Sequence, residues 1–291
     1  MQTLLKGGSA SWLAGGLACL VPRFTDKNLY SAGGPRLNDI KQDAIGDCYF
    51  VATLAAVASQ NPRAIRDAIA YNSRSNTFCV RLYELSGKAR WIVVTQAEIE
   101  DNVTRHGGSY VDNTSKCERV WPAVMETAYA KMFDSDAKNG LGEGYRKITS
   151  GGWPADAMMA LTGSVGSEVR YVYVHQLAKT GSVALLGSRI ATALIQKRAV
   201  TLGAVPEVDS RGWLAKLIGL PIPQDGLADR HVYSVVSMTQ SNGDWLVKLR
   251  NPWGTNMGVG EGRDSESESI TVSLMTLVDT GGLKLFQVSR K

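Results

Sequence analysis

The 291-residue chain has little of what metal centres and disulfide scaffolds require. It contains four cysteines and three histidines, and no two cysteines have a metal-ligand spacing such as Cys-x-x-Cys. We therefore expect no structural zinc site, and four cysteines are too few for a disulfide framework in a chain of this length. Mostly free thiols are typical of a reducing compartment, although a secreted protein can carry the same set.

Long apolar runs, internal repeats and a strong charge of one sign are also missing. No stretch reaches the roughly 20 apolar residues of a membrane span. The net charge is +5, from 32 basic and 27 acidic residues spread along the chain, which argues against a nucleic-acid groove. The apolar segment 9–21 contains glycines and lacks a strongly basic start, so we interpret it as an element packed on the domain, with a targeting segment as the alternative.

The composition that remains is that of a globular protein, with 44% hydrophobic and 20% charged residues, and its pattern changes along the chain. In the first half, the pattern predicts helices at 48–58, 62–70, 120–132 and 154–161, and a hairpin of strands 77–83 and 91–95. In the second half, it predicts strands at 169–174, 199–205, 231–238, 245–250 and 283–288, with helices at 190–196 and 273–279. We therefore divide the chain into an N-terminal segment (1–32), a helical lobe (33–165) and a β-rich lobe (166–291).

Cys48 lies where a loop is predicted to become a helix. Asp47 is the expected N-cap of the apolar run that Cys48 begins. A helix N-terminus lowers the pKa of a thiol, which favours a nucleophilic thiolate. Gln42, six residues earlier, supplies an amide donor that, with the Cys48 backbone N–H, can hold an oxyanion. The alternative is a small cysteine buried in the core.

A base for such a nucleophile must come from the three histidines. His106 lies in a polar turn, and His175 ends a strand-like run. His231 opens a predicted strand in the other lobe, and Asn251 directly follows the next strand. Because residues 241–244 form a strong turn signal, the two strands should make a hairpin that brings His231 beside Asn251. The Asn carbonyl can then accept an imidazole N–H. A strand-edge histidine and a plain Asn-Pro turn are the alternatives.

Four sequence blocks, in this order, resemble the calpain family of cysteine peptidases. They are Gln-Asp-Ala-Ile-Gly-Asp-Cys at 42–48, Trp-Pro-Ala-Val-Met-Glu-Thr-Ala-Tyr-Ala-Lys at 121–131, His-Val-Tyr-Ser-Val at 231–235 and Leu-Arg-Asn-Pro-Trp-Gly at 249–254. The likeness runs from about residue 33 to 288. It implies an α+β, papain-like fold of two lobes with the active site in the cleft between them. It also implies an endopeptidase of protein substrates, cytoplasmic or secreted as a delivered effector.

The resemblance also implies roles for individual residues. These are Cys48 as nucleophile, His231 as base, Asn251 as the group that orients the histidine, Gln42 as oxyanion donor, and Trp253 and Gly46 as residues that line the cleft. Two departures from the family pattern are Tyr49 in place of the usual tryptophan and a long loop at 206–230. Another thiol acyl transferase and an inactive calpain-like binding module remain the alternative functions.

Calcium is the one cofactor that the resemblance suggests. Calpain-like first lobes bind it through a glycine-rich loop and two carboxylates. The matching positions are the Ala32 and Gly34 carbonyls, Asp39, and Glu118 if the alignment shifts by one residue. The alternative is that Asp39 caps a turn and Glu118 is a solvated surface residue. We expect no required cofactor, at most one calcium site, no nucleic-acid partner and no membrane span.

Overall fold

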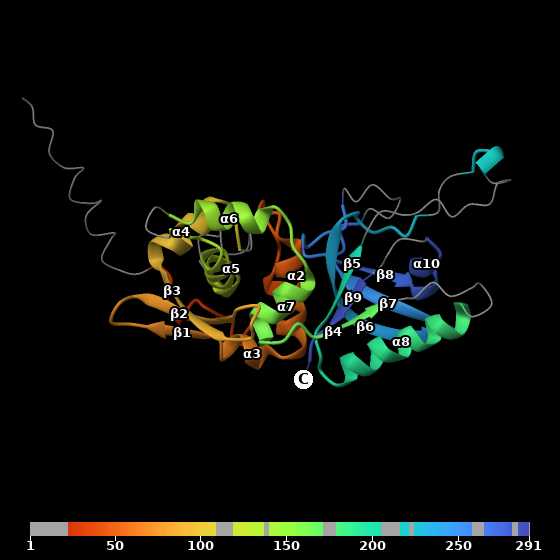
Figure 1. Cartoon of the computed structure of the whole chain (residues 1–291), viewed down its shortest axis with the longest axis horizontal. Helices are drawn as coiled ribbons and strands as arrows, with labels where there is room; N and C mark the ends of the chain where they lie inside the picture. Colours follow the sequence, from red (N-terminus) through yellow and green to blue (C-terminus); the bar gives the residue numbers. More distant parts are fainter. Residues whose placement is uncertain are drawn as a thin grey trace, which may run out of the picture.

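The computed structural model describes residues 23–108, 119–136, 140–170, 179–204, 216–220, 224–257, 265–280 and 285–290. Figure 1 shows their helices and strands grouped into two lobes, with α2 at the boundary. The fold is α+β, as the sequence predicts, with a largely helical first lobe and a sheet in the second. Within these ranges, no helix has both the length and the hydropathy needed to span a bilayer.

The first lobe surrounds one central helix with shorter helices and a small sheet. Its elements are η1 (Leu37–Asp39), α2 (Cys48–Gln60), α3 (Pro62–Arg66), β1 (Ile69–Asn72), β2 (Thr77–Tyr83), β3 (Ala89–Thr95), α4 (Gln96–Thr104), α5 (Trp121–Met132), α6 (Gly142–Thr149) and α7 (Pro154–Thr162). The three strands pair antiparallel in the order β1-β2-β3. The predicted hairpin and the helices that became α2, α5 and α7 are confirmed.

The helix predicted at 62–70 is wrong in its second half. Helix α3 ends at Arg66, and Ile69 begins β1, where it pairs with Val80 on β2. Pro62 and the Asn61 cap start a helix, but the pairing of β1 with β2 overrides helical propensity after one turn. Helices α4 and α6 were not predicted; α4 begins with a capping box between Thr95 and Glu98, which is a readable sequence signal.

Helix α2 is the core of the first lobe because its apolar run is buried on every side. All residues from 49 to 58 are buried, and the ring of Phe50 stacks on that of Tyr129 from α5 at 4.0 Å. Trp121, at the start of α5, is also fully buried. Each such side chain contributes on the order of 1.5–3 kcal/mol by leaving water. The N-terminus of α2, which carries Cys48, is thereby held in a fixed place.

The described part of the second lobe contains a six-stranded antiparallel sheet, with helices among its connections. Its elements are β4 (Ser167–Arg170), α8 (Lys179–Ile195), β5 (Val200–Ala204), β6 (His231–Ser241), β7 (Asp244–Arg250), β8 (Ser269–Ser273), α10 (Leu274–Asp279) and β9 (Leu285–Val288). The strand order is β4-β9-β5-β6-β7-β8. Helix α8 is much longer than predicted, and β8 was missed. Residues 171–174 of the predicted strand 169–174 lie outside the described residues.

Candidate active site

The thiol of Cys48 lies where the two lobes meet. Cys48 is the first residue of α2 and is partly buried. Burial raises the pKa of its thiol to about 11, and the nearby backbone N–H of Val232 on β6 opposes this rise. Val232 directly follows His231, so the start of β6 delivers both an N–H donor and the histidine to the same place as the thiol.

The β6–β7 hairpin places His231 beside Asn251. Asn242 and Gly243 turn the chain with φ values of 49° and 83°, the left-handed conformations that a tight hairpin turn requires. Nε2 of His231 lies 2.9 Å from Oδ1 of Asn251, and both side chains are buried. Because Nε2 faces the asparagine oxygen, Nδ1 is the ring nitrogen left for a second partner.

Trp253 completes the surroundings of the imidazole. Its ring lies against that of His231, with 4.2 Å between the centroids, and its backbone N–H donates to Oδ1 of Asn251 at 3.0 Å. Burial lowers the pKa of His231 to about 4, and the hydrogen bond to Asn251 opposes this shift. The imidazole is therefore neutral near pH 7, which is the form that can accept a proton.

Gln42 is held by both its backbone and its side chain. Its backbone N–H donates to the Pro252 carbonyl at 2.7 Å, next to Asn251. Its side-chain Nε2 donates to the Ile45 carbonyl at 2.7 Å, while Oε1 has no hydrogen-bond partner among the described residues. A side-chain amide carries two N–H groups, so one remains to meet a substrate oxygen.

Further contacts near Gln42 tie the two lobes together. Nη2 of Arg250, which is fully buried, donates to the Ile40 carbonyl at 2.6 Å. Lys41 forms an ion pair with Glu268 at 3.1 Å. One turn along α2 from Cys48, the Ser234 hydroxyl of β6 donates to the buried Ala52 carbonyl at 2.8 Å. These bonds set the position of the Gln42 loop relative to the histidine and the asparagine.

Gly46 has little room for a side chain because the end of α6 lies against it. A Cβ on Gly46 would lie 3.1 Å from the carbonyl oxygen of Thr149. In the α6–α7 connection that follows, Gly152 packs directly on the ring of Tyr49, and Trp153 is 66% exposed. The sequence analysis did not identify the α6–α7 connection as part of the site, although a tryptophan directly after two glycines was a signal that could have indicated it.

His106 does not join this group. It lies at the surface with a φ of 55°, and its Nδ1 is 3.3 Å from Asp43. This agrees with the interpretation of a histidine in a polar turn. His175 lies outside the described residues.

Asp39 and the Gly34 carbonyl, two of the predicted calcium ligands, are engaged in other contacts. Oδ2 of Asp39 accepts the backbone N–H of Arg36 at 2.8 Å and the indole N–H of Trp121 at 3.0 Å. Oδ1 of Asp39 lies 3.7 Å from the guanidinium of Arg119, so a cation already faces this buried carboxylate. The Gly34 carbonyl accepts a hydroxyl hydrogen bond within its own turn.

The remaining calcium positions add no support. Ala32 lies in the same turn as Gly34, and Glu118 lies outside the described residues. Across the part of the chain that the structure describes, no three His, Cys, Asp or Glu side chains are grouped to hold a metal ion.

Asp47 is the N-cap residue of α2, as predicted, but its side chain makes no capping hydrogen bond. It is fully buried and lies against the carboxyl group of Glu126 on α5. Burial competes with capping here, because the helix start is packed inside the lobe.

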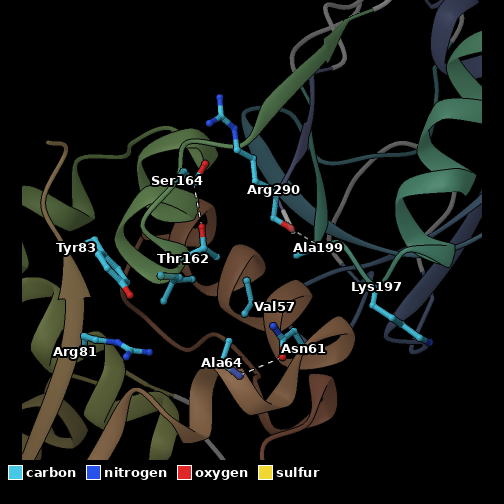
Figure 2. A pocket seen from close by; sticks show the side chains of 12 residues that line it. Val57, Asn61, Ala64, Arg81, Tyr83, Thr162, Ser164, Lys197, Ala199 and Arg290 are labelled. Carbon is cyan, nitrogen blue, oxygen red and sulfur yellow. Dashed lines mark hydrogen bonds between the residues drawn. The ribbon is translucent and has the colours of Figure 1, made fainter. Parts of the chain in front are cut away.

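A cavity of about 170 Å³ lies between the lobes at the other end of α2 from Cys48. Figure 2 shows Arg81 pointing toward Ala64 and Asn61, whereas Lys197 and Arg290 point away from them. The cationic groups therefore do not converge on one point, and the cavity is separate from the cysteine and the histidine.

The chain matches known proteases over most of its length. A family described as calpain family cysteine protease matches residues 19–273. Calpain-13 of Rattus norvegicus is 26% identical over 240 residues, covering 79% of this chain and 31% of that protein. A thiol protease of Porphyromonas gingivalis is 26% identical over 253 residues, covering 83% of this chain and 49% of that protein.

A third relative gives the same result at lower identity. The calpain-2 catalytic subunit of Gallus gallus is 22% identical over 256 residues, covering 85% of this chain and 31% of that protein. The chain thus spans less than half of the length of each of these three relatives.

Proposed function

The chain belongs to the calpain family of cysteine proteases, and we propose that it hydrolyses peptide bonds of protein substrates through Cys48, His231 and Asn251. The observation that carries the proposal is the 2.9 Å contact between His231 and Asn251, next to the β6 N–H that faces the Cys48 thiol. In this proposal, Cys48 of the first lobe is the nucleophile, and His231 and Asn251 of the second lobe are the base and the group that orients it.

The reaction begins with proton transfer from the Cys48 thiol to Nδ1 of His231. Both groups are neutral at rest, because burial raises the pKa of the thiol and lowers the pKa of the imidazole. The thiolate then attacks the peptide carbonyl carbon, and the carbonyl oxygen becomes an oxyanion. The C–N bond breaks as the imidazolium gives its proton to the leaving amine. Water, deprotonated by His231, hydrolyses the thioester and returns the thiol.

The surrounding residues stabilise this charge and place the substrate. Nε2 of Gln42 and the backbone N–H of Cys48 are the proposed oxyanion donors. Asn251 keeps Nε2 of His231 occupied and so leaves Nδ1 for proton transfer. In this proposal, Trp253 and Gly46 line the cleft. Trp153, exposed in the α6–α7 connection, is a further substrate contact.

A peptidyl epoxide that alkylates thiols tests the nucleophile. We expect stoichiometric labelling at Cys48, found by peptide mapping, and protection of that site by a peptide aldehyde. Cys79, which lies on β2, should remain unlabelled. Labelling of Cys79 with Cys48 untouched would refute the assignment.

The products decide between hydrolysis and transamidation. An acyl-enzyme gives a free carboxylate with water and an amide with an added amine. We expect cleavage of a denatured protein substrate to release free carboxyl termini even with millimolar amine present. A product made only with amine would instead support an acyl transferase.

A further inference from the structure

Two buried carboxyl groups lie directly beside the proposed nucleophile. Asp47, the residue before Cys48, is 0% exposed, and Glu126 of α5 is 1% exposed. Their carboxyl groups are in contact with each other. Among the described residues, neither forms an ion pair with a lysine, arginine or histidine. Two charged carboxylates in such a place would repel each other strongly.

The hydrogen-bond donors around this pair are divided unequally. Oε2 of Glu126 accepts from Nδ2 of Asn102 at 2.5 Å and from the backbone N–H of Gly108 at 2.7 Å. Neither carboxyl oxygen of Asp47 accepts a hydrogen bond from another described residue. Burial raises the pKa of both carboxyl groups, but the hydrogen bonds from Asn102 and Gly108 oppose this rise at Glu126, whereas only a backbone N–H opposes it at Asp47. A negative charge is therefore better stabilised on Glu126 than on Asp47.

The cluster is enclosed by closely packed groups. A Cβ on Gly107 would lie 2.4 Å from Oε2 of Glu126 and 2.5 Å from Nδ2 of Asn102, so a larger residue does not fit there. The hydroxyl of Tyr145 lies 3.0 Å from the same Nδ2. The charged groups nearest to this cluster are Asp43, whose charge acts on Glu126 and which pairs with His106, and Arg105, which lies over the Tyr145 ring.

We propose that Asp47 keeps its proton at neutral pH and donates it to ionised Glu126, so that a neutral positioning residue precedes the nucleophile. The shared proton joins the start of α2 to α5 and fixes the place of Cys48. It also removes a negative charge that would oppose the thiolate, because an ionised Asp47 raises the pKa of the Cys48 thiol. Burial, then the charge of Glu126, raise the pKa of Asp47 well above its usual range.

Stability as a function of pH tests the proton directly. Above about pH 4, the unfolded chain ionises Asp47, whereas the native state holds the proton, so wild-type stability decreases as pH rises. Asp47→Asn keeps a donor to Glu126 without binding that proton. We expect the folding constant of Asp47→Asn relative to wild type to rise up to about tenfold per pH unit above pH 4.

The measurement is urea unfolding from pH 4 to pH 8, in a Cys48→Ala background that prevents self-cleavage. Asp26→Asn, at an exposed carboxyl, is the matched control for loss of one charge. If Asp47→Asn does not fold, Asp47→Ser replaces it, since that variant also keeps a donor to Glu126, also lacks the titrating proton and therefore predicts the same rise. A folding-constant ratio that does not change with pH overturns the proposal.

Alkylation of Cys48 gives a second readout. This readout rests on the proposed function, in which Cys48 is the nucleophile. The unfolding measurement is independent of that proposal. The rate of reaction with iodoacetamide against pH reports the thiol pKa. We expect the same midpoint in wild type and Asp47→Asn, because both carry a neutral residue at position 47. A midpoint shifted to lower pH in Asp47→Asn would show that Asp47 is ionised and would overturn the proposal.

Discussion

Gln42→Ala separates a catalytic contribution from a structural one. The substitution removes the side-chain amide but keeps the backbone N–H that donates to Pro252, so the contact between the lobes at this loop persists. The side-chain hydrogen bond to the Ile45 carbonyl is lost, and with it an Oε1 that has no partner among the described residues. The loop should therefore keep its course.

The two effects of Gln42→Ala differ in size. Loss of one ordinary hydrogen bond costs about 0.5–1.5 kcal/mol of stability. In a protein of this size, each kcal/mol of lost stability lowers Tm by about 2–4 °C. Loss of one oxyanion donor lowers kcat by about 10²–10³-fold, or about 2.7–4 kcal/mol of transition-state stabilisation. Turnover should therefore fall far more than stability.

Gln287→Ala provides a matched control. Gln287 on β9 is also buried, its Nε2 also donates to a backbone carbonyl, that of Val165, and its Oε1 also lacks a described partner. Its loss should lower Tm by a similar amount and leave kcat unchanged. Both variants are assayed on a peptide substrate well below their Tm. Equal losses of kcat in both, or a raised KM with unchanged kcat in Gln42→Ala, would refute the oxyanion role of Gln42.

Three further predictions concern the cysteine, the histidine and calcium. Cys48→Ala should abolish proteolysis with Tm nearly unchanged, whereas Cys79→Ala should keep activity; full activity in Cys48→Ala would exclude it as nucleophile. Because burial lowers the pKa of His231 from 6.5 to about 4, its stabilising contribution is complete above pH 6.5 and decreases toward pH 4. Urea unfolding of Cys48→Ala and of the double variant Cys48→Ala/His231→Gln measures this contribution. From pH 7 to pH 4, the free energy of unfolding should fall by about 3 kcal/mol more in Cys48→Ala than in the double variant, and equal losses would contradict this. Peptidase rate and Tm should not differ between chelator and millimolar calcium, because the guanidinium of Arg119 faces Asp39. The variant Arg119→Glu should show a rise in Tm when calcium is added. Strong activation of wild type by calcium would contradict the pairing of Asp39 with Arg119 in place of calcium.

The sequence predicts those parts of the fold that depend on local signals. The β6–β7 hairpin follows from a turn whose Asn242 and Gly243 adopt positive φ, and His231 and Asn251 become neighbours as a direct consequence. Helix α2 follows from an apolar run that ends at Pro62. Long-range effects were not readable: β1 forms because a partner strand pairs with it, although its residues continue a helical pattern.

The site shows the same division between local and distant information. The order of the blocks around Cys48, His231 and Asn251 is contained in the sequence. By contrast, the contact of Asp47 with Glu126 joins residues from distant parts of the chain, and the local signal at Asp47 indicated an N-cap. The cation at Asp39 was also unpredictable, because Arg119 reaches that carboxylate only through the packing of α5 against the loop before α2.

The place of β9 in the sheet has a consequence for how the protein is made. Among the strands of the second lobe, β9 is translated last, yet it pairs with β4 on one side and β5 on the other. While the chain leaves the ribosome, β5 to β8 can pair with their sequence neighbours, but β4 has no strand to join. The sheet therefore closes only after residues 285–288 emerge, so a complete second lobe can exist beside the thiol only after the other strands of this sheet have been made.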